Sequence, residues 1–202
     1  DARFWAGLCP ENLGNLDGMS HPLVVGYKGF TTDFDPELTF PRGDKDFFEH
    51  LRYAIEQVAK TKTRKPSAWH CEDPMLFDNN AKSAGRSWAY ADWRPAQSEY
   101  KMAERIIGFA RDADARVHIC HSSTPATFNN VRSYEGATTE VTWHHATFDK
   151  YDMANDKRLK MNPPLRDITM MEKMRGLLRS GLVPIGTDHA PHTLDEKEGD
   201  NQ

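Results

Sequence analysis

Four side chains that could take part in metal chemistry follow short apolar stretches of this 202-residue sequence. Lys28, His70, His121 and Asp188 each stand at the end of such a stretch. In a barrel of parallel strands the carboxyl ends of the strands meet at one rim, so these side chains are expected to converge. Imidazole and carboxylate ligands without a set of four cysteines favour a borderline divalent ion such as zinc, with one position left for water. The pattern therefore predicts hydrolytic chemistry.

The densest group of candidate ligands lies at residues 186–192, GTDHAPH. It adds one acid and two histidines directly after an apolar stretch, in a chain that has nine histidines. A single histidine is more often a hydrogen-bonded structural residue than a ligand, but histidines at several equivalent strand ends favour a metal site. A carboxylate beside a metal-bound water can carry its proton, and Asp188 is the natural candidate for that role.

The elements that must position these residues alternate between short apolar strands and amphipathic helices. This alternation predicts an α/β fold with parallel strands and crossover helices. Because side chains alternate along a strand, Val117, Ile119 and His121 are expected to share the inner face and His118 to face the helices. The expected strands cover residues 4–8, 23–30, 67–71, 116–121, 140–144 and 182–187.

Three helices are indicated by apolar residues at helical spacing. The first covers residues 47–58, and the second begins near Pro95 and continues to residue 110. Thr169 and Glu172 have the spacing of a capping box at the start of the third helix, and Gly181 follows as its expected end. Residues 78–93 show no clean period and are expected to form a loop with some helix.

The composition of the chain excludes several classes of protein. Its net charge is −4 with the two signs intermixed, which argues against nucleic acid or an anionic membrane as partner and favours a small-molecule substrate. Three cysteines do not make a disulfide framework, so we expect a cytoplasmic protein. The sequence has neither a run of about 18 apolar residues nor the layout of a signal peptide. The length favours one domain.

Four motifs, in the same order along the chain, resemble the class I dihydroorotases of the amidohydrolase superfamily. The resemblance implies a (β/α)8 TIM barrel of the metal-dependent hydrolase type. It also implies a zinc-dependent cyclic amide hydrolase that interconverts dihydroorotate and N-carbamoyl-L-aspartate in pyrimidine biosynthesis. FWAG at 4–7 and PENL at 10–13 are similar to allantoinases, so an allantoinase or hydantoinase is the alternative. The four motifs are WHCEDP at 69–74, VHICHSS at 117–123, KMNPPLR at 160–166 and TDHAPHT at 187–193.

The resemblance also implies a role for individual residues. Lys28 matches a lysine, often carbamylated, that bridges two zinc ions in the family. His70 and His121 match the histidines that hold the more exposed ion, while Asp188 matches the ligand of the other ion that acts as general base and then general acid. The structural alternative for Lys28 is an ordinary solvated lysine. The positions that match substrate contacts are Asn162 and His192.

The chain departs from the family on its N-terminal side. Relatives carry a His-x-His pair on the first strand, whereas His21 stands alone here. Residues 1–202 are therefore expected to form a partial TIM-barrel domain of roughly strands three to eight, without the N-terminal strands and the C-terminal end. Activity is expected of the complete enzyme rather than of this segment. The open strand edges favour a homo-oligomer, with aspartate carbamoyltransferase as a further partner. A non-catalytic dihydroorotase-like subunit is another alternative.

Overall fold

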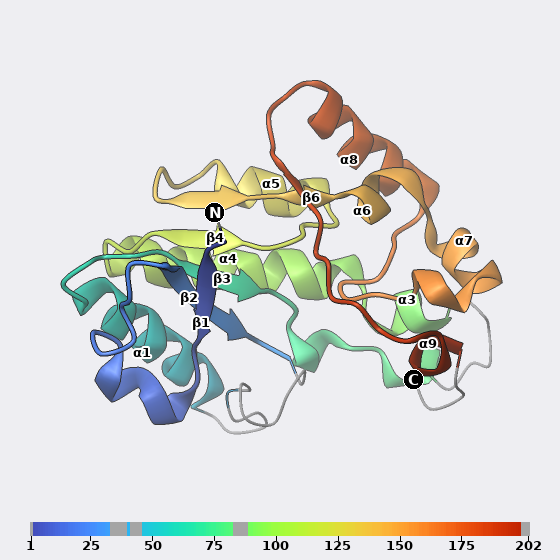
Figure 1. Ribbon diagram of the computed structural model, residues 1–202. Helices are drawn as coiled ribbons and strands as arrows, with labels where there is room; N and C mark the ends of the chain where they lie inside the picture. The colour runs from blue at the N-terminus through green and yellow to red at the C-terminus, as the bar shows by residue number, and fades with distance from the viewer. Residues whose placement is uncertain (1, 33–39, 41–45, 83–88, 199–202) are drawn as a thin grey trace.

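The computed structural model describes residues 2–32, 40, 46–82 and 89–198 (Figure 1). Every strand pair in this part of the chain is parallel, and the strands follow one another across the sheet in chain order. Glu140 alone separates β5 from β6, so one extended segment belongs to both sheets. The five-stranded sheet consists of β1 (Phe4–Gly7), β2 (Val24–Phe30), β3 (Ser67–His70), β4 (Val117–Ile119) and β5 (Ala137–Thr139), and the second sheet of β6 (Val141–Thr142) and β7 (Ile185–Gly186).

Helices connect these parallel strands, and consecutive long helices pack against each other (Figure 1). This arrangement is a partial (β/α) barrel, so the expected α/β class is confirmed. The longer helices are α1 (Phe47–Lys60), α4 (Ala96–Asp112), α5 (Pro125–Val131) and α8 (Ile168–Arg179). The shorter ones are α2 (Asn79–Lys82), α3 (Ala89–Trp93), α6 (Trp143–Thr147), α7 (Lys150–Asn155), α9 (Leu194–Glu198) and the 3-10 turns η1 (Pro10–Asn15), η2 (Pro74–Leu76) and η3 (Lys157–Leu159).

The main core lies between the sheet and helices α1 and α4. Tyr27, Trp69 and Ile119 point from the strands into this core, where each is fully buried. Their neighbours along the strands therefore point to the opposite face of the sheet, which we call the inner face. Buried apolar area of this kind contributes about 25 cal/mol per Å² to folding, which explains why these large side chains face the helices.

The expected orientation of the fourth strand is wrong in one respect. Val117 and Ile119 lie in the core against the helices, and His118 lies on the inner face, where its Nδ1 is 2.9 Å from Oγ1 of Thr138. Strict alternation would then turn His121 toward the helices. Its backbone instead has a φ of 36°, which breaks the alternation and returns its side chain to the inner face.

Two boundaries also differ from the expectations. The strand expected at residues 140–144 starts earlier, at Ala137, and ends at Thr142. It ends there because the hydroxyl of Thr142 accepts from the backbone N–H of His145 and so starts α6. The third long helix starts from Asp167, whose carboxylate accepts from the N–H of Met170, rather than from a capping box at residue 169. Its expected end is confirmed, since Gly181 follows with a φ of 69°.

The remaining expectations concern local features. Residues 78–93 contain α2 and α3, and residues 83–88 of that segment lie outside the described residues. All three cysteines are free and buried. Among the helices that the structure describes, none has both the length and the apolarity needed to cross a membrane.

Candidate metal centre

The imidazoles of His70 and His121 meet at the carboxyl ends of the neighbouring strands β3 and β4. Nδ1 of His70 lies 3.3 Å from Nε2 of His121, and the ring planes are inclined by 64°. Two nitrogens that each lie about 2.0–2.1 Å from one tetrahedral zinc ion are roughly 3.3–3.4 Å apart. The distance between the facing nitrogens therefore fits a pair of zinc ligands.

A buried ion pair fixes the orientation of His70. Its Nε2 lies 2.9 Å from Oε2 of Glu72, and the Arg94 guanidinium holds that carboxylate through both of its oxygens, with 3.1 Å between Nε and Oε1. Burial by itself would raise the pKa of Glu72, but the charge of Arg94 and the hydrogen bond from His70 lower it to about 2. The ionised carboxylate keeps the hydrogen on Nε2, so Nδ1 presents its lone pair to His121. Metal-binding histidines are commonly oriented in this way.

His121 is buried, and its Nδ1 has no hydrogen-bond partner in the described part of the chain. Burial, together with the charges of His70 and Lys28, lowers the pKa of His121 well below its ordinary value of 6.5. The imidazole is therefore neutral at physiological pH and available as a ligand. A buried polar atom without a partner costs about 1–3 kcal/mol, and here it is the nitrogen on the other side of the ring from His70.

Lys28 lies beside this pair on the inner face. Its Nζ donates to Sγ of Cys120 over 2.9 Å and lies 4.9 Å from the ring centroid of Phe30, whose own ring is 6.0 Å from that of His70. An unmodified ammonium cannot bind a metal ion. Lys28 lies on the same face of the sheet as both imidazoles.

Asp188 follows β7 with its side chain exposed and its backbone at a φ of 45°. Partial desolvation raises the pKa of its carboxyl, while the neighbouring charges of Lys28 and His70 oppose the shift. Non-glycine residues in this left-handed region cost about 1–3 kcal/mol each and cluster at functional sites. Asp188 shares this backbone feature with His121.

Neither of the two predicted substrate contacts hydrogen-bonds directly to the imidazole pair, although Tyr90 and Arg94 connect Asn162 to the Glu72 carboxylate behind His70. The Asn162 side-chain oxygen accepts from the hydroxyl of Tyr90 on α3. Nδ1 of His192 lies 3.7 Å from a carboxylate oxygen of Glu196, at the exposed start of α9. In the part of the chain that the structure describes, no hydrogen bond or ion pair joins either residue to the four candidate metal ligands.

The sequence does not assign Glu72 and Arg94 to the site. Arg94 precedes Pro95 and suggests only a helix start, although its guanidinium and the Glu72 carboxylate are both almost fully buried. A second buried pair supports the first, because Arg166 donates to the backbone oxygen of Arg94 over 2.6 Å and lies 3.5 Å from Glu99. The spacing of His70 and Glu72, two residues apart at a strand end, is the one sequence signal that could have indicated their contact.

His145 anchors the loop that carries Asn162. Its imidazole is buried, with Nε2 3.0 Å from the backbone oxygen of Pro163 and Nδ1 2.9 Å from the hydroxyl of Thr142. Burial lowers the pKa of His145 to about 3, although the hydrogen bond to Pro163 opposes the shift. The neutral imidazole therefore joins the end of β6 to the loop.

Acidification should destabilise the protein partly through His145. Below pH 6.5 the unfolded chain takes up a proton at this residue while the folded chain does not, so stability falls as the pH drops toward about 3. The loss should be about 2 kcal/mol at pH 5. Urea unfolding at pH 7 and pH 5 should show that His145→Gln loses less stability on acidification than the wild type. Equal losses in the two proteins would contradict the lowered pKa of His145, since the proteins differ only at this residue.

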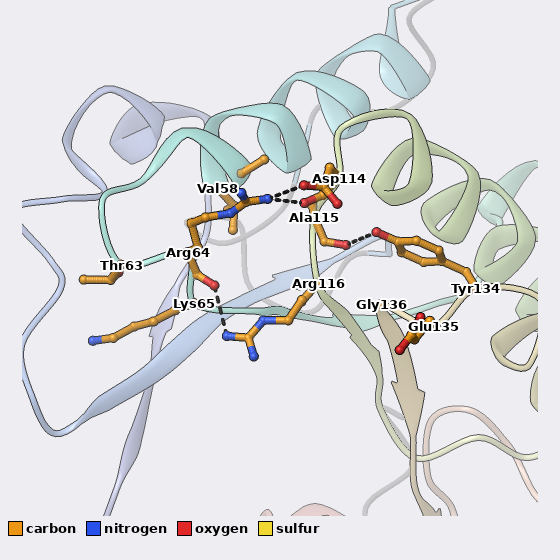
Figure 2. Close-up of a pocket in the computed structure, with 11 residues that line it drawn as sticks. Val58, Thr63, Arg64, Lys65, Asp114, Ala115, Arg116, Tyr134, Glu135 and Gly136 are labelled. Atoms are coloured by element: carbon orange, nitrogen blue, oxygen red, sulfur yellow. Dashed lines mark hydrogen bonds and ion pairs between the residues drawn. The ribbon is translucent and has the colours of Figure 1, made fainter.

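A separate pocket of about 620 Å³ lies at the opposite end of the strands (Figure 2). There Nη2 of Arg64 lies 2.7 Å from Oδ2 of Asp114, and Arg116 donates to the backbone oxygen of Arg64 over 3.1 Å. Sites in (β/α) barrels form at the carboxyl ends of the strands, whereas the amino ends contribute to stability. We therefore place the chemistry at the imidazole pair and not in this pocket.

Comparison with known proteins agrees with the geometry. No protein-family model matches the chain. A dihydroorotase from Methanosphaera stadtmanae is 34% identical in an alignment that covers 69% of this chain and 35% of that relative. An allantoinase from Deinococcus radiodurans is 30% identical in an alignment that covers 100% of this chain and 46% of that relative. The chain thus spans less than half the length of these relatives.

The fold is similar to that of solved hydrolases. An L-hydantoinase (dihydropyrimidinase) from Arthrobacter aurescens superposes with a TM-score of 0.85 at 21% identity, over 98% of this chain and 45% of that structure. This likeness confirms the partial barrel, and the sequence matches add the relationship to dihydroorotases and allantoinases. The chain belongs to the cyclic amidohydrolase family.

Proposed function

We propose that the complete protein is a zinc-dependent dihydroorotase that interconverts dihydroorotate and N-carbamoyl-L-aspartate in pyrimidine biosynthesis. The observation that carries the proposal is the pair of imidazole nitrogens, 3.3 Å apart, on His70 and His121. The ion pair of Glu72 and Arg94 behind His70 supports a metal-binding role. The similarity to a dihydroorotase supports this substrate over other cyclic amides.

The donor set determines which residues would hold the metal. His70 and His121 would bind one zinc ion, and Lys28 and Asp188 would complete the site for two ions in the complete enzyme. Bound zinc lowers the pKa of a water molecule to about 7 and polarises a carbonyl group. Asp188 would accept the proton of that water at a carboxylate oxygen and then donate it to the leaving ring nitrogen.

Two residues would orient the substrate. The Asn162 side-chain oxygen already accepts from Tyr90, so its amide N–H groups are left to donate to a ring carbonyl. His192 is exposed and would bind the substrate carboxylate. The outermost strands of the described sheets bear exposed apolar side chains, Trp5 on β1 and Ile185 on β7, which would be covered in a larger assembly such as a homo-oligomer.

The test is hydrolysis of dihydroorotate, allantoin and hydantoin by the complete, zinc-loaded protein, with the zinc content measured on the same sample. We expect ring opening of dihydroorotate, and loss of turnover with a reduced zinc content in His121→Ala. Activity on allantoin or hydantoin alone would replace dihydroorotase with the allantoinase or hydantoinase alternative. A folded protein with neither zinc nor turnover would instead indicate a non-catalytic subunit.

A further inference from the structure

A second group of potential metal ligands lies on the inner face, next to the imidazole pair. His118, Cys120 and Glu140 offer an imidazole nitrogen, a thiol sulfur and a carboxylate oxygen that all lie within 4.8 Å of one another. His118 and Cys120 are two residues apart along one strand and therefore share a face. The register that pairs His118 with Thr138, continued by two residues, sets Glu140 opposite Cys120.

The hydrogen bonds of His118 direct its free nitrogen toward this group. Nδ1 lies 2.9 Å from Oγ1 of Thr138, and that hydroxyl donates to the backbone oxygen of Val117 over 3.5 Å. The Thr138 oxygen must then accept from Nδ1–H, which leaves the lone pair of Nε2 facing the Glu140 carboxylate at 3.7 Å. A lone pair and a carboxylate repel each other unless a proton or a metal ion lies between them. A hydrogen bond at the other ring nitrogen also orients known metal-binding histidines.

The neighbours of the other two ligands leave room for this arrangement. The carboxyl of Glu140 lies against Gly186 on β7, where an added Cβ would come within 2.4 Å of the Glu140 Cδ. On the other side, Sγ of Cys120 accepts from Nζ of Lys28 over 2.9 Å. A bound metal ion deprotonates a coordinating thiol outright.

We propose that His118, Cys120 and Glu140 form a cation site of their own, suited to zinc or another borderline divalent ion. Sulfur, imidazole and carboxylate donors together select such ions over magnesium or calcium. Three protein ligands leave a fourth position open to water. The site goes beyond the proposed function, since none of its three ligands belongs to the residues assigned to that chemistry.

Cobalt(II) distinguishes this site from the imidazole pair, because only a thiolate ligand gives strong sulfur-to-cobalt charge-transfer absorption in the near ultraviolet. The complete protein, stripped of metal with a chelator, is titrated with Co²⁺. We expect the band to appear in the wild type and in the double variant His70→Ala/His121→Ala, which lacks the other centre. It should disappear in Cys120→Ser and persist in the control Cys71→Ala, another buried cysteine.

Two milder variants keep the test decisive if Cys120→Ser fails to fold. His118→Ala and Glu140→Gln should retain the band but weaken the affinity for Co²⁺ by about tenfold or more. Absence of the band in folded wild-type protein would overturn the proposal. Persistence of the band in Cys120→Ser, or unchanged affinity in both milder variants, would also overturn it. Loss of the band in His70→Ala/His121→Ala alone would mean that the two groups are one site.

Discussion

Asp188→Asn is expected to lower the turnover of cyclic amide hydrolysis by about 10²–10⁴-fold, the range that a positioned acid–base group contributes. Asparagine keeps the size and the oxygen of the side chain but cannot exchange a proton. Partial desolvation raises the pKa of the Asp188 carboxyl above that of an ordinary aspartate. The measurement is kcat of the complete, zinc-loaded protein at saturating dihydroorotate.

Zinc content separates the two roles proposed for this carboxylate. If Asp188→Asn keeps its zinc and loses turnover, the proton-transfer role stands. If zinc and turnover fall together, Asp188 acts mainly as a ligand, and turnover close to that of the wild type would contradict both roles. Asp195→Asn is the matched control, because Asp195 is an exposed acid a few residues further along, on α9.

Arg94→Met should destabilise the protein by about 3–5 kcal/mol, because it leaves the Glu72 carboxylate buried without its cation. Both side chains are almost fully buried, so solvent cannot compensate for the lost charge. Urea unfolding at pH 7 measures the effect. Lys101→Met, which breaks an exposed pair with Glu104 on α4, is the control and should change stability little, because solvent screens exposed ion pairs.

A second substitution tests whether the uncompensated charge is the cause. The double variant Arg94→Met/Glu72→Gln removes the buried charge and should recover part of the lost stability. A loss below about 1 kcal/mol in Arg94→Met would mean that the ion pair contributes little. No recovery in the double variant would mean that the lost packing of the Arg94 stem dominates.

Much of the fold could be predicted because it depends on local patterns. The apolar strands and the helical spacing of residues 47–58 indicate parallel strands with crossover helices, and the structure has both. The alternation along residues 116–121 predicts a strand with two different faces, but it does not show which face packs against the helices. The apolar pair Val117 and Ile119 decides that question, since burial against α4 stabilises apolar side chains more than a histidine.

The site could be predicted in part. Residue type and position at strand ends were enough to nominate His70 and His121, which the structure brings into contact. The pairing of Glu72 with Arg94 joins residues 22 apart through a segment without clean periodicity, so no local pattern reveals it. The left-handed backbone of His121 could not be predicted either, because a histidine does not require this conformation.

The single residue between β5 and β6 fixes the length of the extended segment that the two sheets share. The backbone oxygen of Glu140 accepts from Ser122 over 2.9 Å, while its side chain reaches toward His118. A shift of one residue in a strand turns every following side chain to the other face. Insertion of one residue beside Glu140 would therefore turn the side chains of β6 to the opposite face relative to those of β5. Insertions and deletions are therefore tolerated far less well here than in the surrounding loops.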